Sequence, residues 1–333
     1  MIRFLIIISL IFSSTASFPQ CCAVGGGSPI AGDAAIGVLK EKQFEISANY
    51  QYISSNKFLT ETEPAENFLD NFSSKYLYTR LAYGLSERLT ISVETGYWID
   101  KTQIGLSERD TYSSKGIGDL ILFPRYSIIQ AKGTNYNELT VGMGFKIPLG
   151  SYNDSMGYVE PFSGATFYTT KPLAVQATSG AYDLLFNMFY TGRIPGTLLS
   201  ISANALHIMK GWNPLSEKLG NYTSLGLFVG QTFYNNLNFT LQFKGEWIGK
   251  MEINPDMMMV RFFSYDPEAT GSRKFFVAPQ LSYVFADKLS VFLQSEIPVY
   301  QNVNKTQIAS QTQVTAGLTY RFSITPGSSG SDQ

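Results

Sequence analysis

Apolar and polar residues alternate along most of the chain that follows Glu41. In Leu89–Tyr97, for example, the odd-numbered positions are mainly apolar and the even-numbered positions are polar or small. A period of two residues indicates β-strands whose two faces meet different surroundings. The pattern predicts twelve strands, namely Gln43–Ser54, Lys75–Gly84, Arg88–Ile99, Gly118–Ile129, Glu138–Pro148, Ala181–Thr191, Leu198–Met209, Tyr222–Gln231, Leu237–Ile248, Lys274–Val284, Leu289–Ile297 and Gln311–Phe322.

The connections between these segments alternate in length along the chain. Long connections, such as 55–74 and 149–180, are followed by short ones, such as "LSER" and "FADK". Barrels of the bacterial outer membrane have short periplasmic turns and long extracellular loops, whereas a soluble sandwich has no reason to sort its loops in this way. The sequence therefore predicts an all-β fold, a transmembrane antiparallel β-barrel of about twelve strands over residues 43–322, with both termini in the periplasm.

The two faces of the predicted strands favour a membrane barrel over a water-soluble one. In Glu138–Pro148 the odd-numbered side chains are apolar, and the even-numbered interior positions are Thr, Gly, Gly and Lys. We expect the apolar side to face lipid, with aromatic residues such as Tyr83, Tyr97, Tyr190 and Phe322 near the strand ends. A water-soluble barrel would point the apolar side inward, and twelve strands would enclose more volume than those side chains fill.

The N-terminal and C-terminal segments lack this alternation. Residues 1–17 contain Arg3, an apolar run over 4–12 and then small residues, which is the layout of a secretory signal peptide. We therefore expect an exported protein of the bacterial outer membrane. Residues 18–42 are rich in Gly, and they are either a flexible lead-in or a plug folded into the lumen. Residues 323–333 are expected to form a disordered tail.

Cys21 and Cys22 are the only cysteines and are adjacent in the sequence. Such a pair can form a strained vicinal disulfide or bind a soft metal ion such as Cu(I). Two thiols without a chemical role are an equally open interpretation. No zinc-type spacing or phosphate-binding loop stands out, so we expect no cofactor.

Composition agrees with a membrane barrel. Lys and Arg number 25 and Asp and Glu number 26, so the net charge gives no reason to expect a nucleic-acid partner. Charged residues make up only 15% of the chain, which is low for a soluble surface, while 20 Tyr and 24 Phe are present. After the first twenty residues, no apolar stretch is long enough to span a bilayer as a helix, which takes about 20 residues.

Charged and aromatic side chains recur at the alternate strand positions that are expected to face the lumen. Their charges are mixed in sign and nearly balanced, so we expect no strong ion selectivity. The aromatic residues suit a small apolar or aromatic solute, although ion pairs that brace the barrel and rings that fill space explain the same pattern. The candidate lumen-lining residues are Arg80, Glu94, Trp98, Asp119, Arg125, Lys146, Asp183, Lys244, Glu246, Glu296 and Arg321.

The last strand has a pattern of its own. Gly317, Tyr320 and Phe322 resemble the terminal-strand signal by which the barrel assembly machinery recognises outer-membrane proteins. The resemblance implies that this machinery is a partner of the chain, together with the lipids of the outer membrane. The sequence departs from the signal in having a tail after Phe322, because the signal commonly lies at the very end.

Several stretches resemble one family, the outer-membrane proteins grouped as meta-pathway phenol-degradation or putative transporter proteins. The similar stretches are "YGLSERLTISVETGY", "GIGDLILFPRY", "GFKIPLGSY" and "TSGAYDLLFNMFY", in which Thr178 replaces the first Gly of the family's pattern. The resemblance extends over roughly residues 40–322. It implies a barrel distantly related to fatty-acid and aromatic-hydrocarbon channels.

We therefore expect a channel or transporter for small molecules, with apolar or aromatic solutes favoured, that works by passive diffusion. An enzyme is not expected. An outer-membrane phospholipase also has twelve strands, but "LHIMKG" around the single histidine, His207, has no Ser two residues on, as that family's motif requires. A structural or adhesin barrel is the remaining alternative, and the aromatic-rich segment Tyr158–Tyr168 is its only candidate feature.

Overall fold

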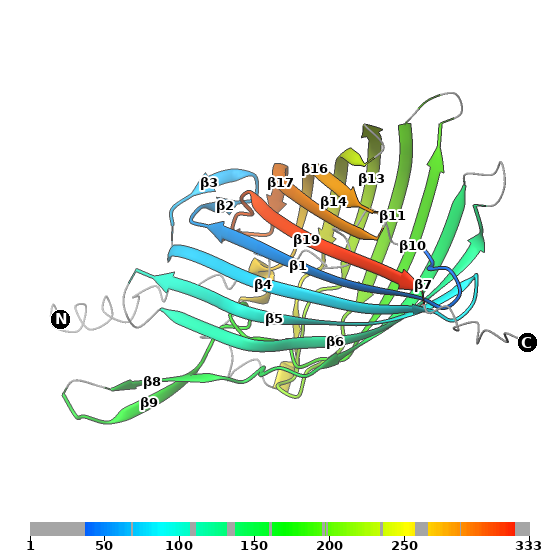
Figure 1. Cartoon of the computed structure of the whole chain (residues 1–333). Coiled ribbons are helices and arrows are strands. Elements are labelled where there is room, and N and C mark those ends of the chain that lie inside the picture. Colours follow the sequence, from blue (N-terminus) through cyan, green and yellow to red (C-terminus); the bar gives the residue numbers. More distant parts are fainter. Residues whose placement is uncertain are drawn as a thin grey trace, which may run out of the picture.

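The computed structural model of the chain is a β-barrel from whose one end several loops extend (Figure 1). The structure describes residues 37–67, 69–106, 111–131, 137–159, 162–194, 197, 199–233, 236–256, 266–286 and 288–323. The predicted signal peptide, the cysteine pair and most of the tail lie outside these residues. No helix in the described ranges is long and apolar enough to cross a membrane.

Twelve long strands of the described chain form a closed barrel in which every neighbouring pair is antiparallel, as the alternation predicted. Hydrogen bonding between β1 and both β4 and β19 closes the ring. The barrel strands are β1 (Gln43–Ser55), β4 (Leu69–Gly84), β5 (Leu89–Gly105), β6 (Tyr112–Ile129), β7 (Glu138–Pro148), β10 (Asp183–Arg193), β11 (Leu199–Met209), β13 (Tyr222–Phe233), β14 (Leu237–Ile248), β16 (Ser272–Phe285), β17 (Leu289–Val303) and β19 (Gln313–Ser323).

The short connections all lie at one end of the barrel, here the short-turn end, and the long connections lie at the other, the loop end (Figure 1). Several strands continue further toward the loop end than predicted. For example, β4 begins at Leu69 rather than Lys75, and β17 ends at Val303 rather than Ile297. These extensions hold polar residues on both faces, such as Asp70 and Asn302. Backbone pairing therefore continues where the alternation in hydropathy has stopped.

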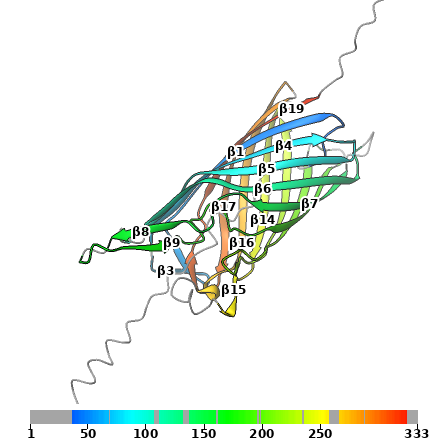
Figure 2. The same ribbon diagram turned by 90° about the horizontal axis from the view of Figure 1, so that it is seen from below.

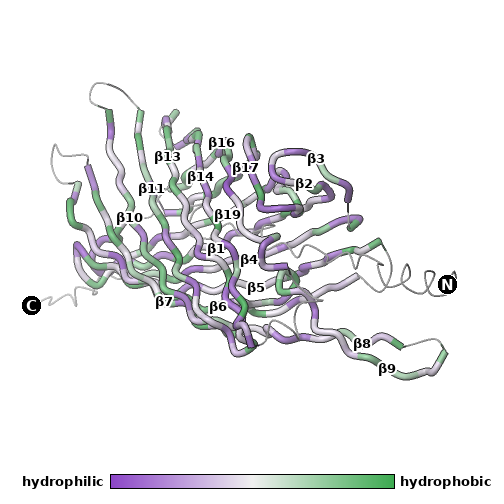
Figure 3. Tube along the Cα trace, turned by 180° about the vertical axis from the view of Figure 1, so that it is seen from behind, coloured by the Kyte–Doolittle hydropathy of each residue, from purple (hydrophilic) through white to green (hydrophobic). Residues whose placement is uncertain are grey.

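The alternation places apolar side chains on the outer surface and polar ones inside, and Figure 3 shows the corresponding change of colour along the strands. On β5, Ile91, Val93 and Tyr97 are exposed, whereas Ser92 and Glu94 are buried. Aromatic rings of β1, β4 and β19 gather on the outside near the short-turn end. Phe44 stacks on Phe322 with 5.4 Å between ring centroids and lies 4.5 Å from Tyr83. This grouping is typical of an interfacial aromatic girdle.

Short strands in the long connections form three small sheets that the sequence pattern did not indicate. They comprise β2 (Phe58–Thr60), β3 (Glu63–Ala65) and β18 (Thr306–Ile308); β8 (Ser155–Val159) and β9 (Thr166–Thr170); and β12 (Glu217–Lys218) and β15 (Glu252–Ile253), with the 3₁₀ turn η3 (Pro267–Ala269) nearby. The β8–β9 hairpin projects away from the barrel in two perpendicular views (Figures 1 and 2). The other two sheets lie over the loop end.

Inward-facing aromatic rings lie flat against the wall because glycines on neighbouring strands leave room for them. A Cβ atom at Gly317 would lie 2.3 Å from Phe292 Cε1 and 2.2 Å from Asn49 Oδ1. A Cβ atom at Gly144 would lie 2.2 Å from Phe123 Cδ2, and Phe123 has no exposed surface. Real Cβ contacts are not this short, so any other residue would push each ring into the lumen.

We expect Gly317→Ala to destabilise the barrel by about 1–3 kcal/mol, because the methyl group overpacks the wall against Phe292 and Asn49. The free energy of unfolding can be measured by urea titration in phospholipid vesicles. Gly118→Ala is the matched control, since its Cβ atom would lie 3.4 Å from the nearest atom, an ordinary contact. If Phe292→Leu and Asn49→Ala together restored none of the loss, the steric explanation would be wrong, and the role of Gly317 in assembly would be favoured instead.

Candidate functional site

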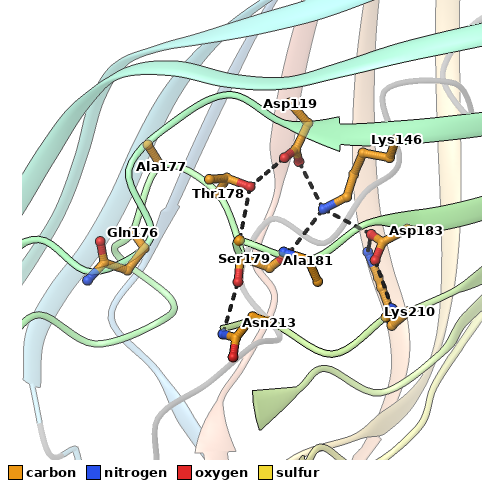
Figure 4. Close-up of polar contacts among 12 residues, drawn as sticks. Asp119, Lys146, Gln176, Ala177, Thr178, Ser179, Ala181, Asp183, Lys210 and Asn213 are labelled. Atoms are coloured by element: carbon orange, nitrogen blue, oxygen red, sulfur yellow. Dashed lines mark hydrogen bonds and ion pairs between the residues drawn. The ribbon is translucent and has the colours of Figure 1, made fainter. Parts of the chain in front are cut away.

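The interior of the barrel holds three groups of charged side chains, and the first lies near the loop end (Figure 4). Lys146 of β7 places its Nζ atom 3.4 Å from Asp119 Oδ2 of β6 and 3.0 Å from Asp183 Oδ2 of β10. Lys210, just after β11, lies 3.0 Å from the same oxygen of Asp183. Two carboxylates and two ammonium groups thus form one balanced cluster, here the loop-end cluster. It joins four strands of the wall.

The loop-end cluster also holds the segment 171–182, here the inner loop, against the inside of the wall (Figure 4). Lys146 donates a hydrogen bond of 3.0 Å to Ser179 Oγ, and the Thr178 hydroxyl donates to Asp119. Trp98 Nε1 donates to the carbonyl of Ala177 at 2.8 Å. The connection 149–180 was expected to be a long loop, and Val175 within it has no exposed surface. Its second half therefore lies against inward-facing residues of the barrel wall.

The second group, the middle cluster, is buried between β13, β14, β16 and β17. Lys244 Nζ lies 2.9 Å from Glu246 Oε1 and 2.6 Å from Glu296 Oε2, and it faces the Phe276 ring at 4.8 Å. The Tyr222 hydroxyl donates to Glu246 at 2.8 Å. Each of these charged side chains is at most 11% exposed. Buried charges are tolerated only when they are paired in this way.

The third group lies nearer the short-turn end and spans the seam where the barrel closes. Glu45 of β1 accepts from Arg80 of β4 and from Arg321 of β19, each at 2.7 Å. Close by, Glu94 of β5 accepts from the Tyr78 hydroxyl and from Ser92 Oγ. Arg125, also predicted to face inward, is 2% exposed. The carboxylates Glu45 and Glu94 and the guanidinium groups of Arg80 and Arg125 are thus buried on this side of the interior.

The described part of the N-terminal segment enters the lumen beside these residues. The backbone N–H of Leu39 donates to Thr90 Oγ1 at 2.8 Å, and that of Val38 donates to Glu138 Oε1 at 3.1 Å. Leu39 is buried and Thr90 has no exposed surface. The segment 37–39 therefore runs along the inside of β5 and β7 at the short-turn end.

The opposite half of the short-turn end contains a cavity of about 320 Å³, here the vestibule. It is lined by the short-turn ends of β10, β11, β13, β14, β16, β17 and β19. Most of its side chains carry a hydroxyl or an amide group, and its lining includes Phe228, Thr240, Gln280, Lys288, Phe292 and Arg321. The vestibule is thus the polar space that the charged groups and the N-terminal segment leave free.

Several interior residues were missed because they lie outside the alternating segments. Gln176, in the inner loop, is 1% exposed and holds the backbone of Asp154 through hydrogen bonds of 3.0 and 3.1 Å. Asn213 donates to the carbonyl of Ser179 at 3.0 Å. Loop sequences have no hydropathy period from which the inward or outward direction of a side chain can be predicted. A sequence feature that is consistent with the burial of Gln176 is that the segment 172–181 contains no charged residue.

The residues weighed for other chemistry lie apart from these groups. His207 is partly buried, and its Nδ1 atom lies 2.8 Å from Thr223 Oγ1 of the neighbouring strand. The structure thus gives His207 a threonine rather than a serine as its hydrogen-bond partner. Cys21 and Cys22 are outside the described residues.

Comparison with solved structures identifies the fold. The chain resembles the COG4313 outer membrane channel from Pseudomonas putida F1, with a TM-score of 0.63, 13% identity, and coverage of 87% of this chain and 98% of that one. More distant matches are the translocator domain of the autotransporter NalP from Neisseria meningitidis (TM-score 0.48, 11% identity, coverage 85% and 90%) and a FadL homologue of Pseudomonas aeruginosa (0.42, 9%, 84% and 90%). No family model and no curated protein matches the chain. The first match supports the outer-membrane barrel fold.

Proposed function

We propose that this protein is a channel of the bacterial outer membrane that admits small molecules by passive diffusion. The observation that carries the proposal is a closed barrel with an apolar outer surface and a polar interior that leaves a cavity of about 320 Å³ at the short-turn end. A purely structural barrel has no need for a polar cavity in its lumen. The short-turn end would face the periplasm, as in other outer-membrane barrels.

The interior favours small solutes over large ones. The inner loop and the middle cluster bring buried side chains into the lumen, and the N-terminal segment enters it from the short-turn end. Aromatic side chains such as Tyr78, Phe123 and Phe228 are buried among the polar groups. This mixture supports the expectation of aromatic or apolar solutes as the transported class.

The other partners of the chain follow from the same proposal. The girdle formed by Phe44, Tyr83 and Phe322 would lie at the membrane interface. Tyr320 stacks on Phe322 in the last strand, so the two aromatic residues of the expected assembly signal lie on the outer surface, whereas Gly317 faces the interior. Export would depend on the signal peptide over residues 1–17.

Single-channel recording of the refolded barrel in planar bilayers tests the proposal, with phenol and a fatty acid added in turn. We expect a small current that one of the two solutes reduces, because a solute in a narrow lumen displaces ions. A steady current unaffected by either would mean a general water-filled pore. A barrel without any current, with or without residues 23–39, would contradict the channel function.

One observation favours the second candidate, an adhesin. The β8–β9 hairpin exposes Phe162, Phe167 and Tyr168, and Phe162 is 99% exposed. Replacing residues 155–170 by a short Gly-Ser linker should leave conductance unchanged if the protein is a channel. Loss of cell-surface attachment in the same variant would support the adhesin instead.

A further inference from the structure

The vestibule differs from the rest of the interior in its charge. The loop-end cluster and the middle cluster pair their cations with carboxylates, whereas no Asp or Glu of the described ranges lines the vestibule. Its two cations are Lys288 and Arg321. Arg321 donates to Glu45, and no carboxylate among the described residues lies within ion-pair distance of Lys288. Among the described residues, Lys288 at the mouth of the vestibule is therefore a cation without a carboxylate partner.

The wall of the vestibule also contains an acceptor that the protein does not satisfy. Gln280 is 8% exposed, and its Oε1 atom has no hydrogen-bond partner among the described residues. A buried amide oxygen without a donor costs free energy, which a ligand that supplies the donor would recover. Thr240 and other hydroxyl groups lie along the same wall.

Two phenylalanine rings supply the apolar part of the lining. Phe228 lies against Gly226 of its own strand, β13, and Phe292 lies against Gly317 of the neighbouring strand β19, which keeps both rings close to the wall. A volume of about 320 Å³ is at the lower end of the range for ligand pockets, roughly 300–1,000 Å³. This space suits a single six-membered ring with small substituents.

We propose that the vestibule is a binding subsite for a monocyclic aromatic carboxylate that also carries a hydroxyl group. The carboxylate binds Lys288 and Arg321 through charge-assisted hydrogen bonds, which are the stronger kind. The hydroxyl donates to Gln280, and the aromatic ring packs against Phe292. The inference rests on the proposed channel function, because it names the class of solute that leaves through the short-turn end.

Isothermal titration of the full-length barrel in detergent tests the subsite without depending on conductance. The probes are 4-hydroxybenzoate, benzoate, which lacks the hydroxyl, and phenol, which lacks the carboxylate. We expect 4-hydroxybenzoate to bind about tenfold more tightly than benzoate, which loses one hydrogen bond. Its advantage over phenol should be larger, because phenol loses the charge-assisted bonds to both Lys288 and Arg321.

Three variants identify the groups involved. Lys288→Gln should weaken both carboxylates about tenfold, and Gln280→Leu should weaken 4-hydroxybenzoate while leaving benzoate unchanged. Lys218→Gln is the control, because Lys218 is a lysine of the loop end that pairs with Glu252. Heat-modifiable mobility on gels confirms that each variant is folded before it is titrated.

The outcomes separate the subsite from the channel. Equal affinity for phenol and 4-hydroxybenzoate, or an unchanged affinity in Lys288→Gln, would overturn the subsite even if the barrel conducts. Selective binding that depends on Lys288 in a barrel that never conducts would support the subsite and contradict the channel function.

Discussion

Deletion of residues 23–39 is expected to raise the single-channel conductance of the barrel severalfold. In the intact chain, the backbone of Val38 and Leu39 is hydrogen-bonded to Glu138 and Thr90 on the inside of the wall. Removing the segment frees that part of the short-turn end for water and ions. The measurement compares wild-type and truncated barrels in planar bilayers at the same salt concentration.

A truncation at the other end of the chain serves as the control. Removing residues 324–333 should leave conductance unchanged, because β19 ends at the exposed Ser323. Thr90→Val, which removes one of the two anchors, should give an intermediate increase or more frequent current steps. An unchanged conductance after deletion of residues 23–39 would eliminate the plug hypothesis and leave a flexible lead-in.

Lys244→Met is expected to lower the free energy of unfolding by about 3–5 kcal/mol, because it leaves buried carboxylates without their cation. Lys244 is the ion-pair partner of both Glu246 and Glu296 in the middle cluster. The loss can be measured by urea titration in vesicles, with tryptophan fluorescence as the signal.

The same substitution in an exposed pair is the matched control. Lys250 pairs with Glu268 in the loops, where both side chains are about half exposed, so Lys250→Met should cost about 0–1 kcal/mol. Adding Glu246→Gln and Glu296→Gln to Lys244→Met should recover much of the loss. If the two lysine variants were equally stable, the middle cluster would contribute nothing to stability.

The barrel itself could be predicted because a membrane imposes the same alternation on every strand. The segments Glu138–Pro148 and Leu237–Ile248 were predicted to the residue, since a turn or loop residue flanks each of them closely. The strand extensions could not be predicted, because outside the membrane no apolar face is required. Backbone hydrogen bonds extend β4 back to Leu69, where Leu69 and Phe72 pack into a small buried cluster with residues of the loop-end sheet such as Phe58.

The sequence predicts which side chains face the interior, but it does not predict which of them contact one another. Parity placed Lys146, Asp183 and Asp119 on the inner face, but their meeting depends on strand register and on the inner loop. Gln176 and Asn213 belong to irregular segments, for which the sequence has no period. The vestibule could not be predicted either, because it is the space left between neighbouring groups. Lys288, which has no carboxylate partner among the described residues, follows a short turn, and its sequence context does not distinguish it from a solvated surface lysine.

The ion pairs of Glu45 have a consequence for the order of events during biogenesis. Glu45 lies in the first barrel strand, and one of its partners, Arg321, lies 276 positions further along the chain. A nascent sheet that lacks its last strand therefore leaves Glu45 paired with Arg80 alone, and Glu45 Oε2 lacks its donor Arg321. Arrival of β19 supplies this second ion pair and also completes the hydrogen-bonded ring. Insertion of the last strand is thus coupled to a buried polar contact at the seam, which penalises incomplete barrels as products of folding.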